Sequence, residues 1–230
     1  MRRSLQDLLR SLRLSLDLLL GRRLVLFGVI DGVVVLLTGM SMLLSSEGAA
    51  GDLYRYVFLV PSVLLGLPAM AGMVDLERQA GCLDLALAAP SAEAYFVRRA
   101  AAVCLAMALQ GELIMGLAWA ASDRSFPLLA PALQIVAASA LLGAVSLFWA
   151  VRLRTAGGVW LASAVTLGAL GQWFFYAPIP DRLHAAFGAF LPGGEASIPW
   201  LKSLAVLVTA AVLFFLYARR RLRRPELMIS

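Results

Sequence analysis

Long apolar runs separated by short charged segments dominate the chain. Six of these runs are about 20 residues long, the length that crosses a bilayer core of about 30 Å as a helix. They cover residues 24–44, 54–74, 100–121, 128–151, 157–177 and 201–218. Backbone polar groups in lipid must be paired within their own segment, so each run is expected to be helical. The pattern predicts an all-α membrane protein with six transmembrane helices, in one domain of residues 24–218.

A different pattern precedes the first run. Leucines recur at helical spacing on one face of residues 4–20, and the opposite face carries Gln6, Asp7, Arg10, Arg13 and Asp17. We expect residues 1–23 to form an interfacial amphipathic helix, with leucines in lipid and arginines toward anionic headgroups. The alternatives are a surface helix on a soluble domain and a signal peptide. The first lacks a soluble domain after it, and charges interrupt the apolar core of the second.

The arginines predict the orientation of the spans. Sixteen basic residues lie before the first run, after the second and fourth runs, and after the sixth. The opposite side holds Arg55, Arg124, Arg182 and Lys202. Because cytoplasmic loops carry the excess of Lys and Arg, we expect both termini in the cytoplasm. Residues 219–230 then form a basic cytoplasmic tail.

Two connections are long. Residues 75–99 form a cytoplasmic loop, and residues 178–200 form an external segment rich in proline and glycine. The external segment contains an apolar stretch, residues 183–191, which is too short to cross a bilayer. We expect a short helical element there, of a re-entrant type, lying on or dipping into the outer leaflet between the fifth and sixth spans.

Composition supports a membrane protein. The chain is 61% hydrophobic and 15% charged, whereas soluble domains carry about 25% charged residues. The net charge of +6 would suit nucleic acid only on the basic face of a soluble domain, so no nucleic-acid partner is expected. Cys82 and Cys104 fall in a loop and a span, so no disulfide is expected. His184 has no ligand neighbours at metal spacing, so no metal site is expected.

The cytoplasmic loop has the features of a docking element. Charged residues cluster at its start, leucines follow at helical spacing, and Pro90 ends the pattern. The residues concerned are Glu77, Arg78, Gly81, Leu83, Asp84, Leu87 and Pro90. A short charged and partly apolar helix between two spans suits contact with a soluble partner. The alternative is an ordinary solvated loop with positive-inside arginines.

These seven residues resemble the loop between the second and third spans of ABC type-2 transporter permeases, in which this segment is the coupling helix that docks on the ATPase subunit. Cys82 stands where the family often has Thr or Ser. The resemblance extends over nearly the whole chain, through the N-terminal helix, the six spans, the external element, Pro192-Gly193-Gly194 and the basic tail. A narrower similarity, in Gly81-x-Leu83 and in residues 155–159, is to the haem-exporter membrane protein of cytochrome c maturation, which the arginine-rich tail fits less well.

The resemblance implies a transport subunit of an exporter in a bacterial cytoplasmic (inner) membrane. It would work with two copies of a separate ABC ATPase, which hold ATP and Mg, and with a second permease chain in a homodimer or heterodimer. Lys202-Ser203 follows Leu201 rather than the glycine of a phosphate-binding loop, so the chain is not expected to be an enzyme or to bind a cofactor directly. An alternative is a non-transporting membrane anchor or assembly factor that recruits a cytoplasmic partner.

Polar residues within the predicted spans are functional candidates, because a charge at depth costs about 2.5 to 3.5 kcal/mol. They are Asp31, Gln110, Glu112, Gln134 and Gln172. Glu112, Gln134 and Gln172 are expected about 8 to 12 Å from the external surface, as a polar belt that lines a path or joins helices. Asp31 lies beside Gly32 in a Gly-x-x-x-Gly pattern, which also allows a packing or dimer role.

Overall fold

The computed structural model describes residues 66–83, 86, 92–121, 129–176 and 198–224, together with residues 29, 32 and 33. Regular structure in these ranges is helical. The five helices are α4 (Leu67–Gln79), α6 (Ala92–Ala121), α7 (Leu129–Ala150), α8 (Ala156–Tyr176) and α9 (Ile198–Leu222). Several predicted features lie outside the described residues: the interfacial helix, the first span, most of the second span, residues 178–197, Asp31, Asp84, Leu87 and Pro90.

The helices follow the apolar runs, and some continue beyond them. α7 and α8 agree with the predicted runs to within one residue at each end. α6 begins at Ala92, eight residues before the predicted span, and α4 continues to Gln79. α9 extends through Arg219, Arg220 and Arg221. Helices therefore occupy both ends of the predicted loop 75–99, because charged side chains there pair with other helices instead of ending the helix in solvent.

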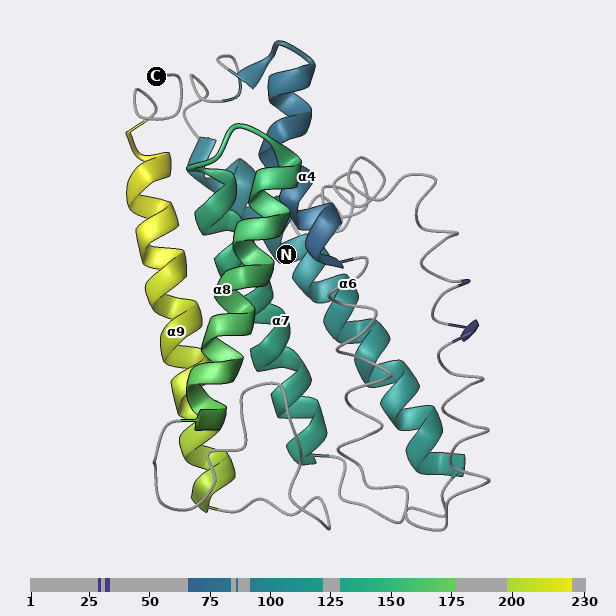
Figure 1. Ribbon diagram of the computed structural model, residues 1–230. Helices are drawn as coiled ribbons and strands as arrows, with labels where there is room; N and C mark the ends of the chain where they lie inside the picture. The colour runs from purple at the N-terminus through teal and green to yellow at the C-terminus, as the bar shows by residue number, and fades with distance from the viewer. Residues whose placement is uncertain are drawn as a thin grey trace, which may run out of the picture.

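α7 is the central helix of the bundle. It packs against α4, α6, α8 and α9, while α6 diverges from α8 and α9 toward the lower right of Figure 1. Consecutive helices from α6 to α9 run in opposite directions. The end of α4, the start of α6, the α7–α8 connection and the end of α9 consequently lie at the same end of the bundle, at the top of Figure 1.

We call this end the basic end, because it carries ten of the eleven Lys and Arg residues among those described. The exception is Lys202, in the second turn of α9. Segments that the sequence separates by more than a hundred residues meet here. This arrangement brings the charged ends of four helices together around one short region.

Close packing at the centre of the bundle depends on apolar and small residues. Leu141, Leu142 and Val145 of α7 are fully buried, as are Met70 and Met73 of α4. A Cβ added at Gly143 of α7 would collide with the Cys104 thiol of α6. Small residues at helix contacts allow backbones to approach closely, as in membrane bundles.

The outer faces of the helices are apolar as well. Leu105, Leu109, Leu113 and Leu117 recur every fourth residue of α6 and are 46 to 67% exposed. Monomeric soluble proteins rarely expose contiguous apolar patches larger than a few hundred Å². Two segments among the described helices, Glu93–Leu117 and Ala132–Ala150, are long and apolar enough to cross a membrane, and Ala156–Leu170 is a shorter apolar segment.

Candidate functional site

The motif residues Gly81 and Leu83 form the end of α4. Gly81 has a positive φ of 67°, and its N–H donates to the carbonyl of Arg78 at 3.1 Å. The N–H of Cys82 donates to the carbonyl of Glu77 at 3.0 Å. These two bonds are those of a Schellman motif, in which glycine takes the left-handed position. Leu83 then returns to the apolar core, so the chain leaves α4 in a defined direction.

Glu77 lies in a buried polar cluster between α4 and α6. Its side chain forms an ion pair with Arg99, and the two residues are 5% and 3% exposed. Tyr95 donates to Glu77 Oε1 at 2.8 Å, and the Arg99 guanidinium lies 4.7 Å from the Tyr95 ring centroid. Arg99 also donates to the carbonyl of Met73 at 2.9 Å. A buried charge is tolerated when it is paired and hydrogen-bonded, so this cluster holds the end of α4 against the first turns of α6.

Arg78 points to a different part of the bundle. Its Nη1 donates to the carbonyl oxygens of Leu153 and Arg154, in the connection between α7 and α8. Thr155 follows this connection as the N-cap of α8, and its hydroxyl accepts from the N–H of Gly158 at 3.2 Å. The adjacent residues Glu77 and Arg78 thus tie the end of α4 to two neighbouring elements.

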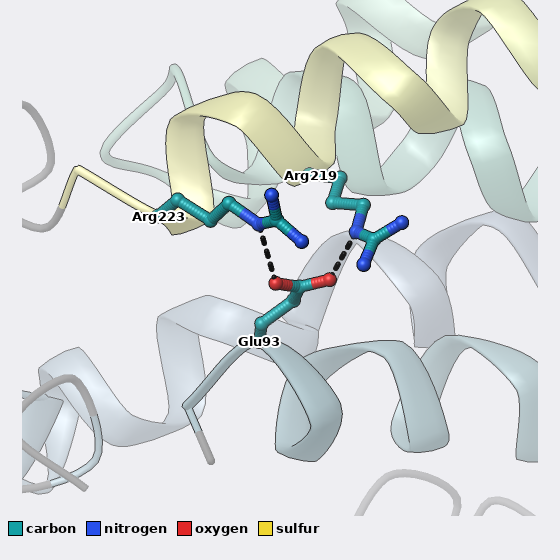
Figure 2. A network of polar contacts seen from close by, with 3 residues as sticks. All are labelled: Glu93, Arg219 and Arg223. Atoms are coloured by element: carbon teal, nitrogen blue, oxygen red, sulfur yellow. Dashed lines mark hydrogen bonds and ion pairs between the residues drawn. The ribbon is translucent and has the colours of Figure 1, made fainter. Parts of the chain in front are cut away.

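A second ion-pair cluster joins the ends of α6 and α9. Glu93 lies in the first turn of α6, where a negative charge favours the helix macrodipole. Its two carboxylate oxygens pair with Nε of Arg219 and Nε of Arg223, the second at 2.8 Å (Figure 2). Both arginines belong to the end of α9, where positive charge is favoured. Each charge therefore stabilises its own helix and the contact between the two.

Of the seven residues predicted to dock an ATPase, the structure describes four. Glu77, Arg78 and Leu83 are directed into this chain, and Gly81 sets the backbone turn. The surface beside them is formed by exposed residues of α4 and α6. These are Leu76, Gln79, Ala80, Tyr95 and Arg98. A soluble partner at the basic end would meet this surface, while the motif residues hold it in place.

The intramembrane candidates lie farther along the bundle. Glu112 is twenty residues after Ala92, about 30 Å along α6 from the basic end. Its Oε1 is buried and has no hydrogen-bond partner among the described residues. Gln134 is buried in the second turn of α7, at the same distal half of the bundle. Gln110 is partly buried on α6, and Gln172 lies in the last turns of α8, where side chains are not described.

Sequence reasoning missed Glu93 and Tyr95 as site residues, and it treated Arg99, Arg219 and Arg223 only as positive-inside residues. The signal available was spacing: Tyr95 and Arg99 are four residues apart, as are Arg219 and Arg223, which places each pair on one helix face. Spacing does not reveal that the partners Glu77 and Glu93 lie on other helices.

The described residues define an all-helical protein with two helices that are long and apolar enough to span a membrane. Within those residues, no three His, Cys, Asp or Glu side chains come together as metal ligands. No protein-family model matches the chain, and no curated protein or solved structure matches it.

Proposed function

We propose that this chain is the membrane-spanning permease subunit of an ATP-driven ABC exporter, which couples ATP hydrolysis by a separate ATPase subunit to export across the cytoplasmic membrane. The observation that carries the proposal is the end of α4. The residues that resemble the coupling motif, Glu77, Arg78 and Gly81, form a joint that attaches this helix end to α6 and to the α7–α8 connection.

Such a joint suits the transmission of movement. Separating Glu77 from Arg99 would leave a buried charge without a partner, which costs about 3 to 5 kcal/mol. A displacement applied after Gly81 therefore moves α4 and α6 together more easily than it separates them. Arg78 extends the connection to the start of α8, and Glu93 extends it to α9. Movement of one surface loop would thus reach four helices at the basic end.

The proposal includes the orientation and the partners. The basic end faces the cytoplasm, in line with the excess of positive charge on that side of bacterial membranes. Six spans then place both termini there. The exposed apolar faces of α6 and α9 face lipid or a second permease chain. Two ATPase copies dock at the basic end, and the substrate path lies between the permease chains.

The test is recovery of the ATPase with the chain. The full chain is purified in mild detergent from its native host, and proteins that accompany it are identified by mass spectrometry. We expect a stoichiometric soluble protein with a phosphate-binding loop, whose ATP hydrolysis depends on the chain. Replacing the exposed Leu76 (L76D) should lower its recovery about ten-fold, since an apolar contact at an interface centre is worth about 2 kcal/mol or more.

The matched control changes an exposed residue at the opposite end of the bundle. K202E should leave ATPase recovery unchanged, because Lys202 lies in the second turn of α9, away from the basic end. If no ATPase is recovered even after mild crosslinking, the proposal is wrong. A soluble partner that binds without chain-dependent ATP hydrolysis would instead support a membrane anchor or assembly factor.

A further inference from the structure

Two arginines on one face of α9 are held in place by a single carboxylate. Arg219 and Arg223 are four residues apart, and each reaches Glu93 through Nε (Figure 2). Among the described residues, these are the hydrogen bonds that the two guanidinium groups make. The amino nitrogens of both groups therefore remain available to another acceptor. The two side chains are 42% and 59% exposed, so that acceptor can approach from outside.

The charge and shape of this arrangement suit a phosphate group. Two positive charges against one negative charge leave the cluster positive. A guanidinium group presents paired N–H donors that match the oxygens of phosphate. Glu93 also holds the two arginines next to each other, so less side-chain freedom is lost when an anion binds.

The surroundings indicate where such a phosphate would come from. Arg219 directly follows the last apolar run of the chain. Leu213 and Leu216 are exposed on α9, and the spacing of three and four residues places them on the same face as Arg220 and Arg223. An acyl chain that lies along Leu213 and Leu216 would bring its headgroup to the arginines. A free phosphate ion would use the arginines alone.

We propose that Glu93, Arg219 and Arg223 form a binding site for the phosphate of an anionic phospholipid in the leaflet at the basic end, with Leu213 and Leu216 beside its acyl chain. The inference rests on the membrane insertion that belongs to the proposed function, and it is independent of an ATPase partner. A lipid bound there would contact the end of α9 and, through Glu93, the first turn of α6.

The experiment measures which lipid the purified full chain retains in detergent. The chain is mixed with equal amounts of phosphatidylglycerol and phosphatidylcholine, and bound lipid is counted by native mass spectrometry. We expect about ten-fold preference for phosphatidylglycerol, in line with the strength of hydrogen bonds to charged groups. The R219K/R223K chain keeps both charges and loses the guanidinium forks, so its preference should fall to about two-fold.

The matched control removes charge elsewhere at the same end. Arg98 and Arg152 are exposed and lie outside the contacts of Glu93, so R98Q/R152Q should keep the original preference. If R219K/R223K keeps the ten-fold preference, or if the control loses it equally, the attraction is diffuse and the proposed site is wrong. Release of the lipid by excess inorganic phosphate would also contradict the proposal, because it would show recognition of the ion alone.

Two further measurements keep the result interpretable. Size-exclusion profiles establish that each variant is folded, and the single R223K chain, with an expected loss of about three-fold, replaces the double variant if that one aggregates. Carbonate extraction of membranes tests insertion separately. A chain that is absent from the membrane fraction contradicts both this site and the permease proposal. A chain that binds the lipid and recovers no ATPase contradicts the permease proposal alone.

Discussion

Glu77 and Arg99 neutralise each other in a buried position between α4 and α6. Tyr95 adds a hydrogen bond to Glu77, and its ring lies beside the guanidinium group of Arg99. Each charge is acceptable in this environment because the other is present. The stability of the basic end therefore depends on a pair of residues, and their individual replacements have consequences that a surface pair would not have.

Replacing Arg99 (R99M) should destabilise the protein by about 3 to 5 kcal/mol, because Glu77 would be left buried without its counter-ion. For a chain of this size that corresponds to a decrease of roughly 6 to 20 °C in Tm. The measurement is thermal unfolding of the purified chain in detergent, followed by size-exclusion chromatography. The E77L/R99M chain should recover most of the loss. A double variant as unstable as R99M would show that the single loss does not come from the unpaired carboxylate.

At the scale of elements, the end of α4 depends on backbone conformation as well as on side chains. Gly81 adopts a φ of 67°, and an added Cβ would meet no atom within 4 Å. The cost of a larger residue there is therefore conformational rather than steric. This glycine makes the turn that directs the following segment out of the bundle, where the proposed ATPase contact lies.

G81A should lower stability by about 1 to 2 kcal/mol, the cost of placing an ordinary residue in the left-handed region. G81N should cost less, because asparagine tolerates that region. Gly72 provides the matched control in the same helix, since an added Cβ also meets nothing within 4 Å and its φ lies outside the positive range. G72A is expected to be neutral or stabilising by about 0.5 to 1 kcal/mol. Equal effects of G81A and G72A on Tm would contradict the conformational explanation.

At the scale of the whole molecule, the antiparallel order of α6 to α9 separates the two ends of the bundle by charge. Arg152 and Arg224 lie at the basic end, and Lys202 lies near the other end. The proposed orientation places the first two in the cytoplasm. This separation makes the orientation measurable with residues that are all exposed.

Single cysteines at these positions should react on opposite sides of the membrane. In a background with Cys82 and Cys104 replaced by serine, R152C and R224C should react with a membrane-impermeant thiol reagent only after cells are permeabilised. K202C should react in intact cells. The physical reason is the retention of positive charge on the cytoplasmic side. Labelling of R224C in intact cells would contradict the orientation, and equal labelling of all three positions would contradict membrane insertion.

The sequence alone determined that the described chain is helical, and it placed α7 and α8 to within one residue at each end. Apolar length is a local property, so it is legible without a fold. The number of spans and the docking role stay predictions. The start of α6 at Ala92 was not predictable in this way, because its first turns are polar and are stabilised by Glu77, Arg219 and Arg223 on other helices.

What only the tertiary structure decided is which charges meet. Glu77 and Arg99 are 22 residues apart in the chain, and Glu93 and Arg219 are separated by 126 residues. A sequence shows that acidic and basic residues lie near the ends of apolar runs. It does not show which ends become neighbours, because burial and pairing depend on the packing of helices around α7. That packing turned part of a motif expected to face a partner into the internal joint that holds the partner's surface in place.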